Sequence, residues 1–169
     1  FTMALSFVSC NKSIDIFDLD INTDPNSPTK GTAELLLPEA ERNLAGFIQG
    51  LNNTQMGFLG VLSSSDSYGL AANSFYGSWS NFYTGPGKDL EEVIVASKAS
   101  DNKPYLGIAQ VLKAYSFSTM VDLFGTVPFK EAFLGNSANI NINPKFDDGK
   151  VIYVECYKLL DSAIFPAIF

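Results

Sequence analysis

The segment that most constrains this chain is the apolar run between Asn102 and Phe133. From Tyr105 to Phe124 nearly every residue is apolar, so a helix built from this run would have no side left to face water. The main interruptions are Gln110, Lys113 and Asp122. A membrane span is excluded, because two charges within a run of about 20 residues are expensive to bury in hydrocarbon. We therefore expect a helix that is covered on several sides, at the centre of a helical stack.

The ends of this central helix are also marked in the sequence. Pro104 suits the first turn, because its φ is fixed near the helical value and its missing N–H would have no partner there. Gly125 supplies the stop and Pro128 follows shortly after, which is the usual order where a helix ends. The helix is therefore predicted to begin near Pro104 and to end at Gly125.

Three further helices are predicted from apolar residues that recur three or four positions apart. The first runs from Thr32, a possible N-cap, to about Gly50, and Pro38 either delays its start or bends its first turns. The second spans Asp89 to Ala99, and the third follows an N-cap at Asp147 or Asp148. The residues expected to face inward are Leu37, Ala40, Leu44, Phe47, Ile48 and Leu51 in the first helix, Leu90, Val93, Ile94 and Ser97 in the second, and Ile152, Cys156, Leu159, Leu160, Ala163 and Ile164 in the third.

The segments between these helices are rich in small and polar residues. Asn52 to Ser67 is predicted to be a loop or a frayed helix. Gly85 to Lys88 is predicted to be a turn, because a phosphate-binding loop would need glycine where Phe82 stands. A polar, Asn-rich loop is expected between Phe133 and the last helix.

The N-terminal residues carry an anchoring signal. Residues 1–9 form a short apolar run that ends in a small residue directly before Cys10, which resembles the end of a lipoprotein signal peptide and its lipobox. We expect Cys10 to be acylated, since several acyl chains on one cysteine give stable membrane anchoring. Residues 10–31 are predicted to form an extended tether, because apolar and polar side chains alternate along its part from Ile14 to Asn22. The alternative is a buried N-terminal strand with an ordinary cysteine.

A calcium site in this tether is disfavoured by the sequence. Asp18, Asp20 and Asn22 match the first spacings of a calcium loop, but Thr23 and Thr29 stand where glycine and glutamate are needed. A solvated face of an extended strand is therefore favoured, and no metal site is predicted.

Composition and charge exclude several classes of function. The net charge of −7, from 11 basic and 18 acidic residues, opposes nucleic acid as a partner, because no positive field attracts phosphates. The absence of histidine removes the Ser-His-Asp and Cys-His mechanisms and the common zinc motifs. Glycosidase chemistry needs only two carboxylates, but the pairs Glu91/Glu92 and Asp147/Asp148 are adjacent and point in different directions. We predict no catalytic residue and no cofactor.

The densest aromatic patch lies between Ser74 and Lys88. Positions 75, 79, 82 and 83 are spaced as in a helix, so the patch is predicted first to be a core stripe. The second interpretation is a sugar-stacking platform, in which aromatic faces pack on the C–H surfaces of a sugar and neighbouring polar groups bind its hydroxyls. The candidate ligand-binding residues are Tyr76, Trp79, Asn81 and Tyr83, of which the first two are expected to be exposed.

Three segments resemble the SusD/RagB family of surface lipoproteins of Bacteroidetes. They are INTDPNSPT (Ile21 to Thr29), NKPYLGIAQVLKAYSFSTMVDLFGTVPFKEAF (Asn102 to Phe133) and IYVECYKLLDSAI (Ile152 to Ile164). The resemblance implies an all-α, TPR-like stack of antiparallel helices behind an extended N-terminal tether, although no clean repeat of about 34 residues is visible. Because members of the family are considerably longer, residues 32–169 are expected to be the N-terminal part of a SusD-like helical domain.

The resemblance also implies a function. A SusD-like lipoprotein is attached to outer-membrane lipid, here through acylated Cys10, and faces the cell surface, where it captures a glycan or another nutrient. It passes this ligand to a TonB-dependent outer-membrane transporter of the SusC type. Two alternatives stay open: a structural helical adaptor that docks only on protein partners, and a carboxylate-based glycosidase.

Overall fold

Helices make up most of the described structure, a computed structural model in which residues 31–59, 73–136 and 141–168 are described. The helices are α1 (Ala33–Phe58), α2 (Tyr76–Thr84), α3 (Pro86–Ala99), α4 (Lys103–Phe124), the short 3-10 helix η1 (Leu134–Asn136) and α5 (Gly149–Ile168). Within these residues the one β-type pairing is an isolated bridge between Val127 and Asp147. The prediction of an all-α fold is confirmed.

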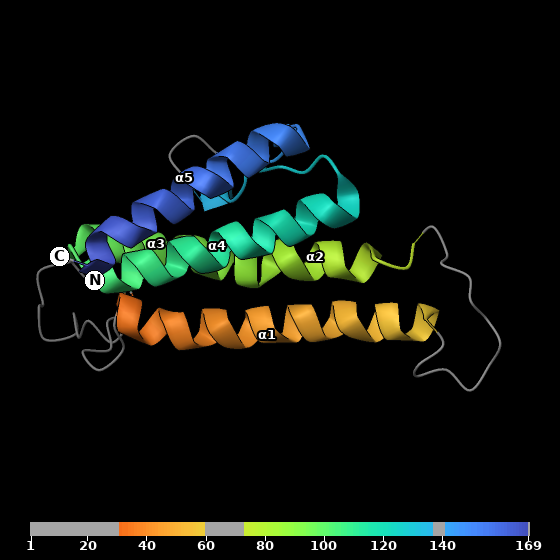
Figure 1. Cartoon of the computed structure of the whole chain (residues 1–169), viewed down its shortest axis with the longest axis horizontal. Helices are drawn as coiled ribbons and strands as arrows, with labels where there is room; N and C mark the ends of the chain where they lie inside the picture. The colour runs from red at the N-terminus through yellow and green to blue at the C-terminus, as the bar shows by residue number, and fades with distance from the viewer. Residues whose placement is uncertain (1–30, 60–72, 137–140, 169) are drawn as a thin grey trace, which may run out of the picture. The chain divides into compact units, whose positions relative to one another are not determined.

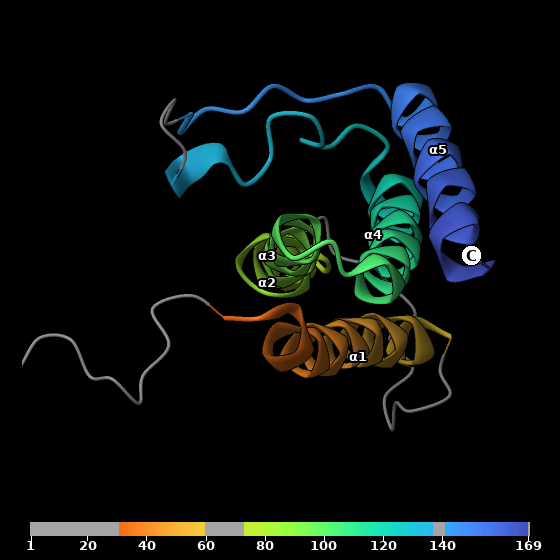
Figure 2. The same cartoon turned by 90° about the vertical axis from the view of Figure 1, so that its left-hand side faces the viewer.

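The helix pairs α1–α3, α3–α4 and α4–α5 run antiparallel (Figure 1). α1 and α4 point in one direction, whereas α2, α3 and α5 point in the other (Figure 1). α4 lies between α3 and α5, and α1 packs below α3 (Figure 2). The connection from α4 to α5, of which residues 125–136 and 141–148 are described, reaches over α2 and α3 instead of closing a tight turn (Figure 2). The predicted central position of α4 is therefore confirmed. The path of the long connection over α2 and α3 could not be predicted from the helix pattern.

α4 and α5 approach closely because small residues recur every seven positions along both helices, as in an antiparallel coiled coil. The residues of this small-residue seam are Gly107, Ala114 and Val121 on α4, and Gly149, Cys156 and Ala163 on α5. A Cβ added at Gly107 would lie 3.2 Å from the backbone oxygen of Ala163. Cys156 is a buried free thiol in this seam, as predicted for a small core residue, and burial raises its pKa.

The two charges within the apolar run of α4, Lys113 and Asp122, have specific partners. Lys113 forms an ion pair with Glu91 of α3, and its ammonium lies 5.4 Å from the centre of the Phe129 ring, a cation–π distance. The carboxylate of Asp122 accepts a hydrogen bond of 2.5 Å from the hydroxyl of Tyr153 on α5, and this bond raises the pKa of that tyrosine. Both charges thus tie α4 to a neighbouring helix.

The interior divides into two clusters of buried residues. One, the aromatic core, contains Phe47, Phe82, Phe117, Met120 and Ile152 and draws on α1, α2, α4 and α5. The other contains Leu37, Leu90, Val93, Ile94 and Ala109 and joins α1, α3 and α4. All four inward residues predicted for Asp89–Ala99 are buried.

Several boundaries differ from the prediction. α1 continues past Gly50 to Phe58, because its last turns pack against α2 and bury Leu51, so tertiary contact outweighs the weak helix propensity of this segment. Pro38 lies inside α1 and does not delay its start. The predicted turn at Gly85 to Lys88 shrinks to one residue: Gly85 donates its N–H to Asn81 and accepts one from Asp89, and α3 begins at once with Pro86.

Two faces are more exposed than predicted. Ile164, expected inward, is exposed because it lies on the side of α5 turned away from the seam. α4 is covered by α3, α5 and part of α1, but one side, carrying Ile108, Val111 and Tyr115, remains open among the described residues.

Asp148 is the N-cap of α5, accepting the N–H of Lys150, so of the two predicted caps it is the one used.

The predictions for residues 1–30 lie outside the described residues. These are the signal-peptide end, the anchor at Cys10, the extended tether and the disfavoured calcium motif.

Candidate ligand-binding pocket

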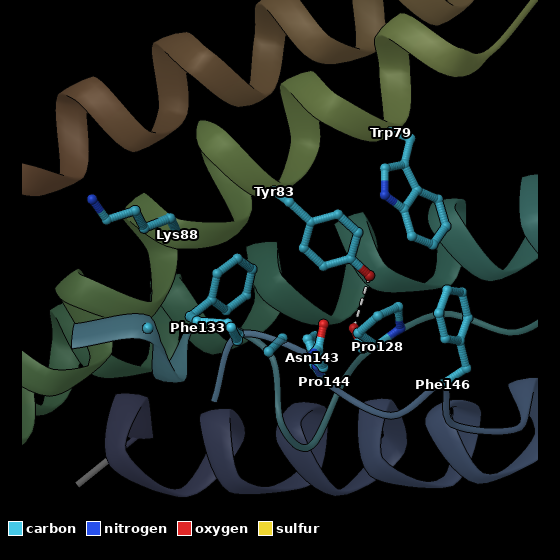
Figure 3. A pocket seen from close by; sticks show the side chains of 11 residues that line it. Trp79, Tyr83, Lys88, Pro128, Phe133, Asn143, Pro144 and Phe146 are labelled. Atoms are coloured by element: carbon cyan, nitrogen blue, oxygen red, sulfur yellow. Dashed lines mark hydrogen bonds between the residues drawn. The ribbon is translucent and has the colours of Figure 1, made fainter. Parts of the chain in front are cut away.

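A pocket of about 630 Å³ lies between α2 and the α4–α5 connection (Figure 3). One wall comes from α2 and the first turn of α3, and the other from both arms of the connection. Its lining residues are Trp79, Tyr83, Lys88, Pro128, Ala132, Phe133, Gly135, Ile142, Asn143, Pro144 and Phe146. Their character is mainly apolar and aromatic, with a few polar groups, which is typical of a small-ligand site.

Four aromatic rings form a continuous surface in this pocket. The Trp79 and Tyr83 rings lie one helical turn apart, with centroids separated by 5.1 Å. The ring centroids of Tyr83 and Phe133 are 5.7 Å apart. The Trp79 ring stacks on the Phe146 ring with centroids 5.7 Å apart and an angle of 21° between the planes. Figure 3 shows these side chains turned toward a common space. Rings in such arrangements attract one another beyond the area they bury, so these contacts stabilise the four rings against one another.

Two carboxylates hold the long connection in shape. The side chain of Asp147 accepts the backbone N–H groups of Phe129 at 3.1 Å and Lys130 at 2.9 Å, while its backbone pairs with Val127. Glu131 accepts the backbone N–H of Lys145 at 3.1 Å and the side-chain amide of Asn141 at 2.7 Å. Both arms are therefore tied to each other by charge-assisted hydrogen bonds, so the pocket wall keeps a defined geometry without regular secondary structure.

The Tyr83 hydroxyl fastens α2 to this wall. It donates a hydrogen bond of 2.8 Å to the backbone oxygen of Pro128 (Figure 3). Burial, and to a smaller extent the nearby charge of Asp147, raises the pKa of Tyr83 well above its ordinary value of 10.0. The hydroxyl therefore stays protonated as a donor over the whole physiological range.

Tyr83→Phe should test this fastening. The free energy of unfolding is expected to fall by about 1–2 kcal/mol at neutral pH, because the Pro128 carbonyl loses its partner. Since the folded-state pKa is raised, the native chain holds its proton longer than the unfolded chain, so stability falls as pH rises above about 10. The variant should lose that part of the alkaline slope. Urea unfolding between pH 7 and 11 measures both effects, and an unchanged alkaline slope would contradict the assignment.

Phe133 has an unusual backbone conformation in this wall. Its φ is +64°, a region that bulky side chains rarely adopt. The ring packs against Tyr83 and Phe117, and it fits because Gly87 of α3 has no side chain: a Cβ there would lie 2.7 Å from the Phe133 ring. Strained residues held by their surroundings concentrate at functional sites, which supports the pocket as such a site.

Two of the four predicted ligand-binding residues line the pocket and two do not. Trp79 and Tyr83 line the pocket and pack against the aromatic core, so the core-stripe prediction is confirmed for them and the sugar platform stays a prediction. Trp79 was expected to be exposed but is half-buried, because Phe124 and Phe146 pack on its ring. Tyr76 has 77% of its surface exposed, as expected, but it does not line the pocket, and neither does Asn81. The pocket is also lined by three residues that were not predicted from the sequence, Phe133, Phe146 and Asn143. The one signal for them in the sequence is an aromatic residue, Phe146, within an otherwise polar, Asn-rich loop.

The carboxylates considered for catalysis all have structural partners. Glu91 pairs with Lys113 and Glu92 with Lys88, while Asp147 and Asp148 accept backbone N–H groups. In the described part of the chain no group of three or more Cys, Asp or Glu side chains is arranged to hold a metal ion. Among the described residues that line the pocket there is no Asp or Glu.

A helical scaffold with an aromatic pocket is typical of a binding protein. In the described helices none is long and apolar enough to cross a membrane. The chain belongs to the SusD-like family, whose sequence model, described as starch-binding and associating with the outer membrane, matches residues 25–167. A comparison with curated proteins gave no match.

Proposed function

We propose that this chain binds a glycan in the pocket between α2 and the α4–α5 connection, as the capturing part of an outer-membrane nutrient-uptake system. The observation that carries the proposal is the aromatic surface of Trp79, Tyr83, Phe133 and Phe146 in a chain whose family is described as starch-binding. The apolar faces of a sugar ring pack well on aromatic rings. The ligand would leave unchanged, because the nearby carboxylates are occupied by structural partners.

Polar groups at the pocket are few, and their positions suggest the orientation of the ligand. The Asn143 amide lines the pocket and can both donate to and accept from sugar hydroxyls. The Tyr83 hydroxyl donates its hydrogen bond to the backbone oxygen of Pro128, so toward a ligand its oxygen acts as an acceptor. We propose Trp79 and Tyr83 as the stacking residues. Tyr76 and Asn81 are proposed as contacts for parts of a longer ligand outside the pocket.

Anchoring and delivery complete the proposal. Acylated Cys10 would hold the protein in the outer membrane at the cell surface, and a SusC-type TonB-dependent transporter would receive the glycan. The support is the lipobox-like sequence before Cys10 and the family match, whose description includes association with the outer membrane. Mass spectrometry of the mature N-terminus should show an acylated Cys10; an unmodified thiol behind an uncleaved leader would contradict the anchor.

Trp79→Ala is expected to reduce binding of maltoheptaose, a soluble starch fragment, by about tenfold or more, because the largest stacking surface is removed. Isothermal titration calorimetry measures the change. Tyr115→Ala is the matched control: it removes an aromatic ring that is 51% exposed on the open side of α4, away from the pocket. Equal affinities for Trp79→Ala and the wild type would refute the pocket as the glycan site.

One observation favours the adaptor as a second candidate function. Exposed apolar residues follow one side of α4 at spacings of three and four, and two more lie seven apart on α5. The residues are Ile108, Val111, Tyr115, Tyr157 and Ile164. The nearest residues of the two stripes to the Asp122–Tyr153 hydrogen bond are Tyr115, about two turns before Asp122, and Tyr157, about one turn after Tyr153. Contiguous exposed apolar surface often marks a protein contact. A chain that retains the transporter but binds no glycan would support this candidate.

A further inference from the structure

We infer that Phe146 is a movable cover on Trp79: its ring lies on the indole face where a sugar would stack, and binding requires that ring to turn away. This inference rests on the proposed function and adds the residue that controls access to the central aromatic surface. It follows from the packing around Trp79, from the exposure of Phe146 and from the fixed backbone on either side of it.

Three rings pack around Trp79 in the described part of the chain, and the ring of Phe146 is the one that stacks on the indole. Phe124 meets the indole edge-on at 5.0 Å and 88°, and Tyr83 meets it at a tilt of 48°. Both of these rings pack against the aromatic core and cannot leave without disturbing it. Phe146 is different, because its ring is close to parallel with the indole, 21° between the planes at 5.7 Å. A sugar that packs flat on Trp79 would need this same position.

Phe146 is held weakly compared with the rings it touches. It is 62% exposed, and among the described residues it does not belong to those packed against the aromatic core. The stack on Trp79 is the one aromatic contact that it makes within the described part of the chain. Its side chain can therefore move without opening a cavity in the core.

The backbone at Phe146 is fixed on both sides. The N–H of Lys145 is held by the Glu131 carboxylate at 3.1 Å, and the N–H of Asp147 by the Val127 oxygen at 3.0 Å. Motion of the ring is therefore a rotation about its side-chain bonds and not an opening of the loop. Exposed side chains rotate on the picosecond to nanosecond timescale, so the cover would slow binding little. It would lower the affinity instead.

The size of this effect follows from competition. An aromatic pair contributes an amount that corresponds to about a two- to tenfold change in an equilibrium constant. When the binding-competent arrangement is only fractionally populated, the apparent dissociation constant rises by the same factor. Phe146→Ala, which removes the competing ring, should therefore bind maltoheptaose about two- to tenfold more tightly than the wild type.

Two measurements on the full chain test the inference, and the first needs no ligand. Trp79 is the sole tryptophan of the chain, so acrylamide quenching of its fluorescence reports directly on its cover. Quenching should rise in Phe146→Ala and remain at the wild-type level in Tyr115→Ala, which removes an exposed ring elsewhere. The second measurement is calorimetric titration of the same proteins with maltoheptaose.

Each outcome separates the inference from the proposed function. Increased quenching with tighter binding in Phe146→Ala supports the cover. Unchanged quenching overturns it whatever the ligand does. Increased quenching with weaker binding also overturns it and makes Phe146 part of the stacking platform, while the proposed function stands. If neither the wild type nor Phe146→Ala binds maltoheptaose while Trp79 becomes more exposed, the glycan site at Trp79 fails, and the ligand role of the cover fails with it.

Discussion

Phe117→Ala is expected to lower the free energy of unfolding by about 3–5 kcal/mol, a large share of the total for a domain of this size. Phe117 is fully buried at the point where α2, α4 and the α4–α5 connection meet. Its ring meets Phe82 edge-on at 5.0 Å and Phe129 at 4.7 Å. Alanine would leave a cavity, because the surrounding rings are fixed on two different elements, α2 and the connection, and cannot all move inward to fill it. Urea unfolding followed by circular dichroism gives the loss.

The matched control is Phe58→Ala, the same chemical change at the last residue of α1, where 40% of the surface is exposed. It should cost much less, on the order of 1 kcal/mol or below, since water already reaches the ring. Similar losses at both positions would show that the aromatic core is not centred on Phe117.

Gly149→Ala is expected to destabilise the fold by about 1–3 kcal/mol through overpacking of the α4–α5 seam. A Cβ at this position would lie 2.6 Å from the backbone oxygen of Gly125 and 2.8 Å from Val121. Gly125 cannot easily yield, because it ends α4 with a φ of +75° and donates its N–H to Val121 at 2.8 Å. The helices would have to separate at the point where the pocket connection begins.

Gly46→Ala is the matched control, and it is expected to change the stability in the opposite direction. In the middle of α1, a Cβ at Gly46 meets no atom within 4 Å among the described residues. Alanine there should stabilise the protein by about 0.5–1 kcal/mol, because glycine in a helix interior is entropically costly. Thermal unfolding of both variants should shift the midpoint in opposite directions. A gain at Gly149 as well would contradict the close approach of α4 and α5.

The helices could be predicted because their signals are local. Pro104 and Gly125 delimit α4 to within a residue, and the spacing of Leu90, Val93 and Ile94 identifies the inward face of α3. The end of α1 could not be predicted, because its last turns are stabilised by α2, whose position is not encoded in the sequence of α1. Similarly, Ile164 has the right spacing for burial but lies where no described element covers it.

Half of the candidate site could be predicted from α2 alone. Trp79 and Tyr83 lie four positions apart and share one face, so a helical reading brings them together. Phe133 and Phe146 reach the pocket only because Asp147 and Glu131 fold the long connection back over α2. Those hydrogen bonds join positions separated by 14 and 18 residues in a segment without periodicity. Composition alone identified this segment as a polar loop and did not reveal the aromatic wall.

The central claim is that a glycan is bound at the aromatic surface around Trp79, and a fluorescence titration tests it most directly. Maltoheptaose is added to the full chain while the emission of its single tryptophan is recorded, with calorimetry in parallel. We expect a saturable change in Trp79 emission, and the dissociation constant from this change should equal the one from calorimetry. Saturable heat without any change in Trp79 emission, or no binding at all, would contradict it.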